Sequence, residues 1–284
     1  MSRFGLIVLL MGLVGGCAPV AKHAKNGEAL PKTGEQERDA SGFTNIFSTG
    51  SAFAALKPDG SVVTWGNSKE GGDSSQVAGK LTSGVTNIFS TRWAFAALKA
   101  DGSVVTWGDS RYGGNPWYGS EKLTSGVTNI FSTGSAFAAL KGDGSVVTWG
   151  NSSYGGDSSK VSEKLTSGVT SIFSTRWAFA ALKADGSVVT WGNSSGGDSS
   201  KVSEKLTSGV TNIFSTDKAF AALKADGSVV TWGDSSYGAD SSKASGQLTS
   251  GVTNIVSTGS RFAALKADGS VVTWGGVEVW GGVR

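Results

Sequence analysis

Few side chains in this chain are suited to catalysis. Among its 284 residues it has one cysteine, Cys17, and one histidine, His23. His23 precedes the repeated part of the chain, so the repeats lack the commonest general base and zinc ligand. Serines are abundant, but the repeats have no histidine to activate one, and the glycine-rich stretches lack the Gly-Lys-Ser/Thr ending of a phosphate loop. We therefore predict a protein that is not an enzyme, with no catalytic residue, no metal site and no cofactor.

Aspartates recur in two settings. The Gly-Gly-Asp-Ser-Ser loops contain Asp73, Asp157 and Asp198, and each loop offers one carboxylate, whereas calcium requires several oxygen ligands. The Asp-Gly pairs, from Asp59-Gly60 to Asp268-Gly269, are typical of tight turns between antiparallel strands. Both patterns favour a role in shaping turns.

Cys17 ends a short apolar segment. Arg3 is followed by an apolar run from Phe4 to Val14, which is too short to cross a bilayer as a helix and is typical of a signal peptide. The run Val14-Gly15-Gly16-Cys17 resembles the bacterial lipobox, which implies a signal peptide over residues 1–16 and a lipid anchor on Cys17. The following Ala18, in place of aspartate, favours the outer membrane by resemblance to enterobacterial lipoproteins. An ordinary signal peptide with an incidental cysteine is the alternative.

Residues 17–40 form the second predicted segment. Between Ala18 and Ala40, lysine, arginine, glutamate and aspartate alternate with almost no large apolar residues. Such a segment buries too little surface to fold. We predict a flexible tether that holds the rest of the chain, residues 41–284, away from the membrane.

The third segment consists of six tandem copies, each marked by a tryptophan. The spacing of these tryptophans is 42 residues, with one spacing of 41: Trp65, Trp107, Trp149, Trp191, Trp232 and Trp274. A repeat of this length indicates a solenoid or a propeller.

Each copy predicts three short strands. In the third copy these are Asn129–Thr133, Phe137–Lys141 and Ser145–Trp149, which are apolar runs too short for helices. Pro58 and Gly60 suit a type I turn followed by a residue in the left-handed region. A sheet that is apolar on both faces needs a neighbour on each side, and radial packing provides it. The repeated phenylalanines and tryptophans should then pack between blades.

The repeat has three characteristic runs in a fixed order: Ile-Phe-Ser-Thr-Gly, Ala-Phe-Ala-Ala-Leu-Lys and Asp-Gly-Ser-Val-Val-Thr-Trp-Gly-Asn. This order resembles the repeat of the regulator of chromosome condensation (RCC1) family over nearly all of residues 41–276. The resemblance implies an all-β, RCC1-like β-propeller with six blades, or an incomplete one of seven. Two departures stand out: the family's frequent histidine before the second strand is absent, and Tyr-Gly-Gly-Asp-Ser-Ser replaces Gly-Gln-Leu-Gly. The nucleotide-exchange and chromatin functions of eukaryotic members are not carried over.

The sequence leaves two possibilities for the closure of the propeller ring. The tail can complete a ring if Val277–Trp280 pairs with the first strand of the repeats. Otherwise the chain keeps an open edge that is prone to association.

Two loops differ between copies. The first follows Ile-Phe-Ser-Thr and the second follows Trp-Gly. Arginine and aromatic residues on loops of a rigid scaffold are typical of recognition surfaces. The candidate binding residues are Arg92, Trp93, Arg176, Trp177, Arg111, Tyr112, Trp117 and Tyr118. Two alternatives remain: the rings fold back on neighbouring loops, or the two loop types open on different faces.

The sequence thus favours a non-enzymatic binding scaffold in the bacterial envelope, with a protein or a glycan as its unidentified partner. The formal net charge of +3 includes Arg3, and no concentrated basic face indicates nucleic acid. A structural repeat array or adhesin is the second hypothesis. A propeller-based polysaccharide lyase or hydrolase is a lesser one.

Overall fold

The computed structural model describes residues 42–115 and 120–276. Within them the backbone forms six three-stranded antiparallel sheets, each from consecutive strands. The predicted signal peptide, Cys17, the tether and the Val277–Trp280 strand lie outside the described residues, as do Trp117 and Tyr118.

The six sheets, called blades 1 to 6 below, share one strand pattern. Their strands are β1 (Asn45–Ser48), β2 (Ala52–Leu56) and β3 (Val62–Gly66); β4 (Val85–Ser90), β5 (Ala94–Lys99) and β6 (Val104–Gly108); β7 (Val127–Ser132), β8 (Ala136–Lys141) and β9 (Val146–Gly150); β10 (Val169–Ser174), β11 (Ala178–Lys183) and β12 (Val188–Gly192); β13 (Val210–Ser215), β14 (Ala219–Lys224) and β15 (Val229–Gly233); and β16 (Val252–Ser257), β17 (Arg261–Lys266) and β18 (Val271–Gly275). The three strands predicted for each copy are confirmed.

The second and third strands of each blade are joined by the predicted hairpin. In blade 1 the Lys57 N–H donates to the Ser61 carbonyl and the Gly60 N–H donates to the Lys57 carbonyl. Gly60 has a φ of +76°, the left-handed conformation that glycine adopts at no steric cost. The Asp59 carboxylate accepts a hydrogen bond of 2.9 Å from the Ser61 N–H. The turn chemistry predicted from Asp-Gly is therefore confirmed.

In blades 1 to 5 the segment after the tryptophan is more regular than a loop. Asn151 caps the first 3-10 turn of blade 3 by accepting from the Ser153 N–H at 3.0 Å, and the equivalent bond recurs in blades 1, 2, 4 and 5. The short helices are η1 (Ser68–Glu70), η2 (Ser75–Lys80), η3 (Ser110–Tyr112), η4 (Ser120–Leu123), η5 (Ser152–Tyr154), η6 (Ser159–Leu165), α1 (Ser194–Gly197), η7 (Ser200–Leu206), η8 (Ser235–Tyr237) and η9 (Ser242–Gln247).

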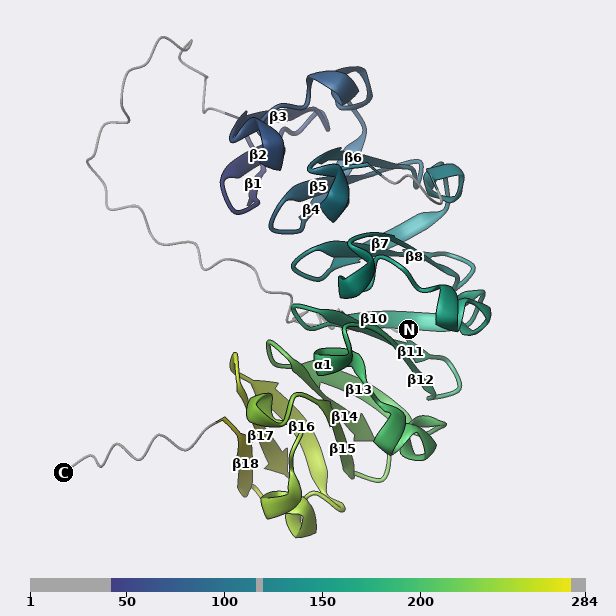
Figure 1. Ribbon diagram of the computed structural model, residues 1–284, viewed down its shortest axis with the longest axis vertical. Coiled ribbons are helices and arrows are strands. Elements are labelled where there is room, and N and C mark those ends of the chain that lie inside the picture. The colour runs from purple at the N-terminus through teal and green to yellow at the C-terminus, as the bar shows by residue number, and fades with distance from the viewer. Residues whose placement is uncertain (1–41, 116–119, 277–284) are drawn as a thin grey trace, which may run out of the picture.

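The blades follow one another along an open arc, with blade 1 and blade 6 at its two ends (Figure 1). The first strands of neighbouring blades, such as β1 and β4 or β10 and β13, contact each other along one side of the stack. An apolar cluster fills each of the five junctions between blades. The all-β fold of six radially packed blades predicted from the repeats is thus confirmed.

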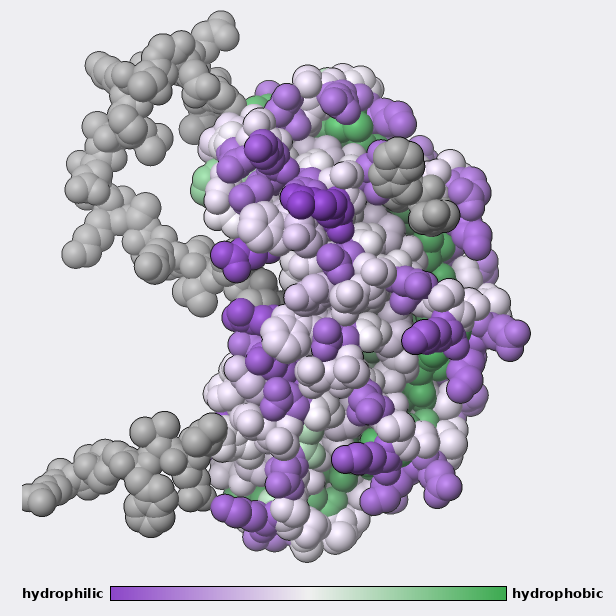
Figure 2. Space-filling view, viewed as in Figure 1, coloured by the Kyte–Doolittle hydropathy of each residue, from purple (hydrophilic) through white to green (hydrophobic). Residues whose placement is uncertain are grey.

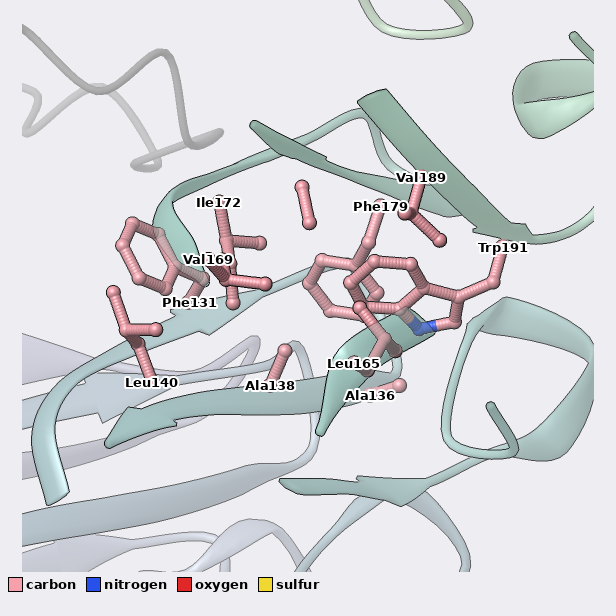
Figure 3. Close-up of a cluster of buried hydrophobic side chains, with 11 residues drawn as sticks. Phe131, Ala136, Ala138, Leu140, Leu165, Val169, Ile172, Phe179, Val189 and Trp191 are labelled. Carbon is pink, nitrogen blue, oxygen red and sulfur yellow. The ribbon is translucent and has the colours of Figure 1, made fainter. Parts of the chain in front are cut away.

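Each junction contains a stacked pair of rings. In the junction between blades 3 and 4, Phe179 and Trp191 stack with centroids 5.2 Å apart and pack against Ala136, Ala138 and Leu140 of the preceding blade (Figure 3). The Trp191 Nε1–H donates to the Gly155 carbonyl of blade 3 at 3.1 Å. Aromatic stacking adds to the apolar area that the junction removes from water. The interpretation of these phenylalanines and tryptophans as packing between blades is confirmed for blades 2 to 6. It is wrong for blade 1, where Phe53 stacks on Trp65 but is 42% exposed, because no described blade covers that face.

The junction between blades 4 and 5 lacks this hydrogen bond. Trp232 is buried, but its Nε1 has no hydrogen-bond partner. The fourth copy is one residue shorter than the others, because it lacks the tyrosine found as Tyr154 in the third. The shortened loop forms α1 in place of a 3-10 turn, so its backbone no longer presents a carbonyl to the next tryptophan.

Trp191→Phe and Trp232→Phe should therefore lower the free energy of unfolding by different amounts. Both changes remove the same volume, but only Trp191→Phe leaves a buried carbonyl, that of Gly155, without its donor. We expect Trp191→Phe to lower the free energy of unfolding by about 1 kcal/mol more than Trp232→Phe does. Urea denaturation of both variants measures the difference, and equal costs would contradict the assignment of the unpaired Nε1.

The hairpin aspartates should make stability depend on pH. Hydrogen bonds from the Ser103 hydroxyl and backbone lower the pKa of Asp101, and the other five copies repeat the arrangement. A carboxyl with a lowered folded-state pKa stabilises the fold above its ordinary pKa and loses that contribution as pH falls. We expect a constant melting temperature from pH 7 to about 5 and a decline below about pH 4, measured by circular dichroism. A decline centred near pH 6 would contradict it.

Candidate binding surface

The two variable loops lie at the same end of each blade. The first loop joins the first and second strands, the second loop follows the third strand, and the strands are antiparallel. In blade 2 the Asp109 N–H donates to the Trp93 carbonyl at 3.0 Å, and the Thr91 hydroxyl donates to the Tyr112 carbonyl at 3.2 Å. The two loop types therefore share one end of the stack, which we call the loop end.

A row of backbone hydrogen bonds links the first loops of successive blades. The Gly50 N–H donates to the Arg92 carbonyl at 2.8 Å, and the row continues through Gly134, Arg176, Asp217 and Gly259 at 2.9–3.0 Å. The residue after each member is the variable aromatic or polar position, such as Trp93 or Trp177. The row thus fixes the spacing of these side chains from blade to blade.

The first aromatic cluster lies on blade 2. The rings of Trp93 and Tyr112 stack with centroids 5.5 Å apart. The Arg92 guanidinium lies 5.3 Å from the centroid of Trp93, and that of Arg111 lies 5.4 Å from the centroid of Tyr112. Both rings are half-buried and both arginines are exposed. The cluster therefore presents cationic groups to solvent over a fixed aromatic base.

The second aromatic cluster spans blades 3 to 5. Tyr154 of blade 3 meets Trp177 of blade 4 edge to face at 6.3 Å. The Lys218 ammonium of blade 5 lies 4.2 Å from the centroid of Trp177 and 4.4 Å from that of Tyr237. A cation between two rings is held by the negative faces of both. Side chains from three blades thus form one continuous surface.

Ion pairs hold two of the arginines. Arg176 Nε lies 3.2 Å from an oxygen of Asp217, which joins blades 4 and 5. Arg111 forms two hydrogen bonds with Asp109, at 3.1 and 2.8 Å. The Arg111 side chain lowers the pKa of Asp109, and the carboxylate raises the pKa of Arg111 in return. These contacts orient the guanidinium groups rather than leaving them free to rotate.

The structure brings together six of the eight predicted residues at the loop end: Arg92, Trp93, Arg111, Tyr112, Arg176 and Trp177. Trp117 and Tyr118 lie outside the described residues. Sequence reasoning missed Tyr154, Lys218 and Tyr237 as members of the surface. Alignment of the copies contained the signal, because Lys218 occupies the position of Trp93 and Trp177, and both tyrosines occupy that of Tyr112.

In residues 42–115 and 120–276 no three His, Cys, Asp or Glu side chains gather closely enough to hold a metal ion. The Asp157 carboxylate instead accepts from the Ser159 N–H at 2.8 Å, as a turn residue does. A groove of about 1010 Å³ between η6 and η7 is open and lined largely by serine, lysine and aspartate side chains. Across the same residues, no helix has the length and apolar character needed to cross a membrane.

Comparison with known proteins finds no matching family model and no matching curated protein. Among solved structures, the chain is similar to yeast RCC1 (Prp20) crystallised with Kap60, at 17% identity and a TM-score of 0.47, covering 81% of this chain and 70% of that one. The chain is also similar to human WBSCR16, at 17% identity and a TM-score of 0.47, covering 81% of this chain and 76% of that one. For the ectodomain of the Arabidopsis thaliana receptor kinase ACR4, the identity is 15% and the TM-score 0.42, covering 82% of this chain and 81% of that one.

Proposed function

We propose that this chain is a non-enzymatic binding module, held at the bacterial envelope by a lipid on Cys17, that recognises a protein through its loop end. The observation that carries the proposal is the convergence of Tyr154, Trp177, Lys218 and Tyr237 from three blades into one surface. Tryptophan and tyrosine side chains, together with arginine, dominate the energetics of protein interfaces.

Comparison of the copies indicates that the position of Trp93 and Trp177 does not require an aromatic ring for a blade to form. Ser51, Ser135 and Ser260 occupy the position of Trp93 and Trp177 in blades whose strands have the same pattern. A half-buried tryptophan on a loop, where serine supports the same blade, contributes surface rather than architecture. This contrast supports a role in recognition over the alternative that the rings only complete loop packing.

A protein partner fits the surface better than a glycan. Sugars bind tryptophan by lying flat on a ring face, whereas cations already lie over the rings of Trp93 and Trp177. Guanidinium groups oriented by Asp109 and Asp217 favour carboxylates and backbone carbonyls of a protein. The surface is also unequal from copy to copy, which favours one specific site over a structural array of equivalent weak contacts.

The double change Trp93→Ala/Trp177→Ala should weaken partner binding at least about ten-fold, because each removes an aromatic anchor. The full chain, solubilised in detergent and immobilised, is incubated with envelope extract, and retained proteins are quantified by mass spectrometry. Ser51→Ala/Ser260→Ala is the matched control at equivalent positions. Equal retention by both variants would overturn the site. If the wild type bound sugars on a glycan array and the tryptophan variant did not, the partner would be a glycan and not a protein.

Anchoring has its own test. Cells expressing the full chain are fed an alkynyl palmitate, and we expect label on the wild type and none on Cys17→Ser. The variant Cys17→Ser/Ser41→Cys moves the only thiol away from the Val14-Gly15-Gly16 run and should also stay unlabelled, because the lipobox is read by its position. Labelling of the moved thiol, or of Cys17→Ser, would contradict a lipobox.

A further inference from the structure

The two ends of the arc expose the two halves of an interface that the chain uses five times internally. The front face of a blade is the face toward the preceding blade, and its back face is the face toward the following blade. In each junction, the front face of one blade packs on the back face of the blade before it. Between blades 1 and 2 the front face consists of Ile88, Phe95, Ala97, Val105 and Trp107, and the back face consists of Phe47, Ala52, Ala54, Leu56 and Val62. Within residues 42–115 and 120–276, no blade precedes blade 1 and none follows blade 6.

The front face of blade 1 is exposed as a result. Ile46 is 59% exposed and Phe53 is 42% exposed, whereas the equivalent isoleucines and phenylalanines of blades 2 to 6 are at most 2% exposed. The Phe53 ring still stacks on Trp65 with centroids 5.4 Å apart, so the face keeps the shape of an internal one. Exposed apolar side chains in this arrangement mark an interaction site.

The back face of blade 6 is exposed in the same way. Val256, Leu265 and Val271 are 61%, 45% and 60% exposed, whereas the leucines equivalent to Leu265 in blades 1 to 5 are at most 9% exposed. In the space-filling view, hydrophobic colour is visible at both ends of the arc and also along the side between them (Figure 2).

The hydrogen bonds between blades all run in a fixed direction, so the front face and the back face offer different donors and acceptors. In the row at the loop end each blade donates an N–H to a carbonyl of the following blade. Among the described residues the row therefore ends at the Gly50 carbonyl and the Gly259 N–H. The serine hydroxyls run the other way, since Ser90 donates to the Ser48 carbonyl at 2.8 Å and Ser257 donates to the Ser215 carbonyl at 2.7 Å. A partner for the front face must consequently offer an N–H and a serine carbonyl in this register.

We propose that the front face of blade 1 docks on the back face of blade 6 of a second copy of this chain. This back face offers the apolar side chains, the Gly259 N–H and the Ser257 carbonyl in the required register. The contact is heterologous, so repetition of it closes a ring of copies or extends a filament. It is independent of the partner recognised at the loop end.

Two residues make this contact weaker than an internal junction. On the back face of blade 6, Val256 replaces the phenylalanine of the other copies, and Arg261 replaces their alanine. Less apolar surface is then buried, and a charged side chain lies near the contact. We expect reversible association, and restoration of the internal residues should tighten it.

Engineered cysteines test the contact in the full chain. A Cβ at Gly50 would lie 3.3 Å from Arg92 Cγ of the next blade, so cysteines at equivalent positions of adjoining blades lie within reach of a disulfide. Separate Gly50→Cys and Gly259→Cys chains are mixed and oxidised, and covalent dimers are measured on non-reducing gels. Gly50→Cys/Arg92→Cys within one chain calibrates the geometry, and the wild type controls for Cys17.

The mixture should give at least about ten-fold more covalent dimer than either variant alone, because the two faces differ. Phe53→Lys in the Gly50→Cys chain should abolish the dimer while circular dichroism shows the fold retained. Val256→Phe/Arg261→Ala in the Gly259→Cys chain should increase the dimer. The proposal is overturned if the mixture gives no covalent dimer, or if Gly50→Cys alone gives as much dimer as the mixture. It is also overturned if the double variant Gly50→Cys/Gly259→Cys forms a disulfide within one chain at dilutions where the mixture gives no dimer.

Discussion

Every feature of this structure depends on the fact that each sheet is apolar on both faces. A three-stranded sheet with phenylalanine and tryptophan on one side, and alanine, leucine and valine on the other, cannot shield both from water alone. Burial against neighbours on both sides makes stability a property of the stack, as in other repeat proteins. Phe137, which is fully buried between blades 2 and 3, shows the result, and Phe53, half exposed at the end, shows what the neighbour supplies.

The rigidity of the stack allows the loops to vary. Hairpins closed by Asp-Gly and capped 3-10 turns satisfy the local backbone, so the first loop tolerates serine, tryptophan or lysine at one position. The hydrogen-bond row from Gly50 to Gly259 holds these positions in line. A surface assembled in this way draws Tyr154, Trp177 and Lys218 from different blades, although they are distant in sequence.

The tandem copies serve as comparisons within one molecule. Deletion of one residue in the fourth copy changes a 3-10 turn to α1 and leaves the Trp232 Nε1–H buried without an acceptor, while Trp191 keeps its own. The blade nevertheless packs, because stacking of Phe220 on Trp232 at 5.2 Å is retained. Apolar burial thus outweighs the lost hydrogen bond at this junction.

The sequence by itself determined the strands, the hairpins and the stacking of blades, because these follow from short-range patterns: alternating apolar runs, Asp-Gly turns and a fixed period marked by Trp65 to Trp274. It also identified Trp93 and Trp177 as loop residues. Only the tertiary structure decided that both loop types share one end, that Lys218 lies between Trp177 and Tyr237, and that the six described blades follow an arc. These depend on the angle and register between blades, which arise from packing and are not encoded in any single copy.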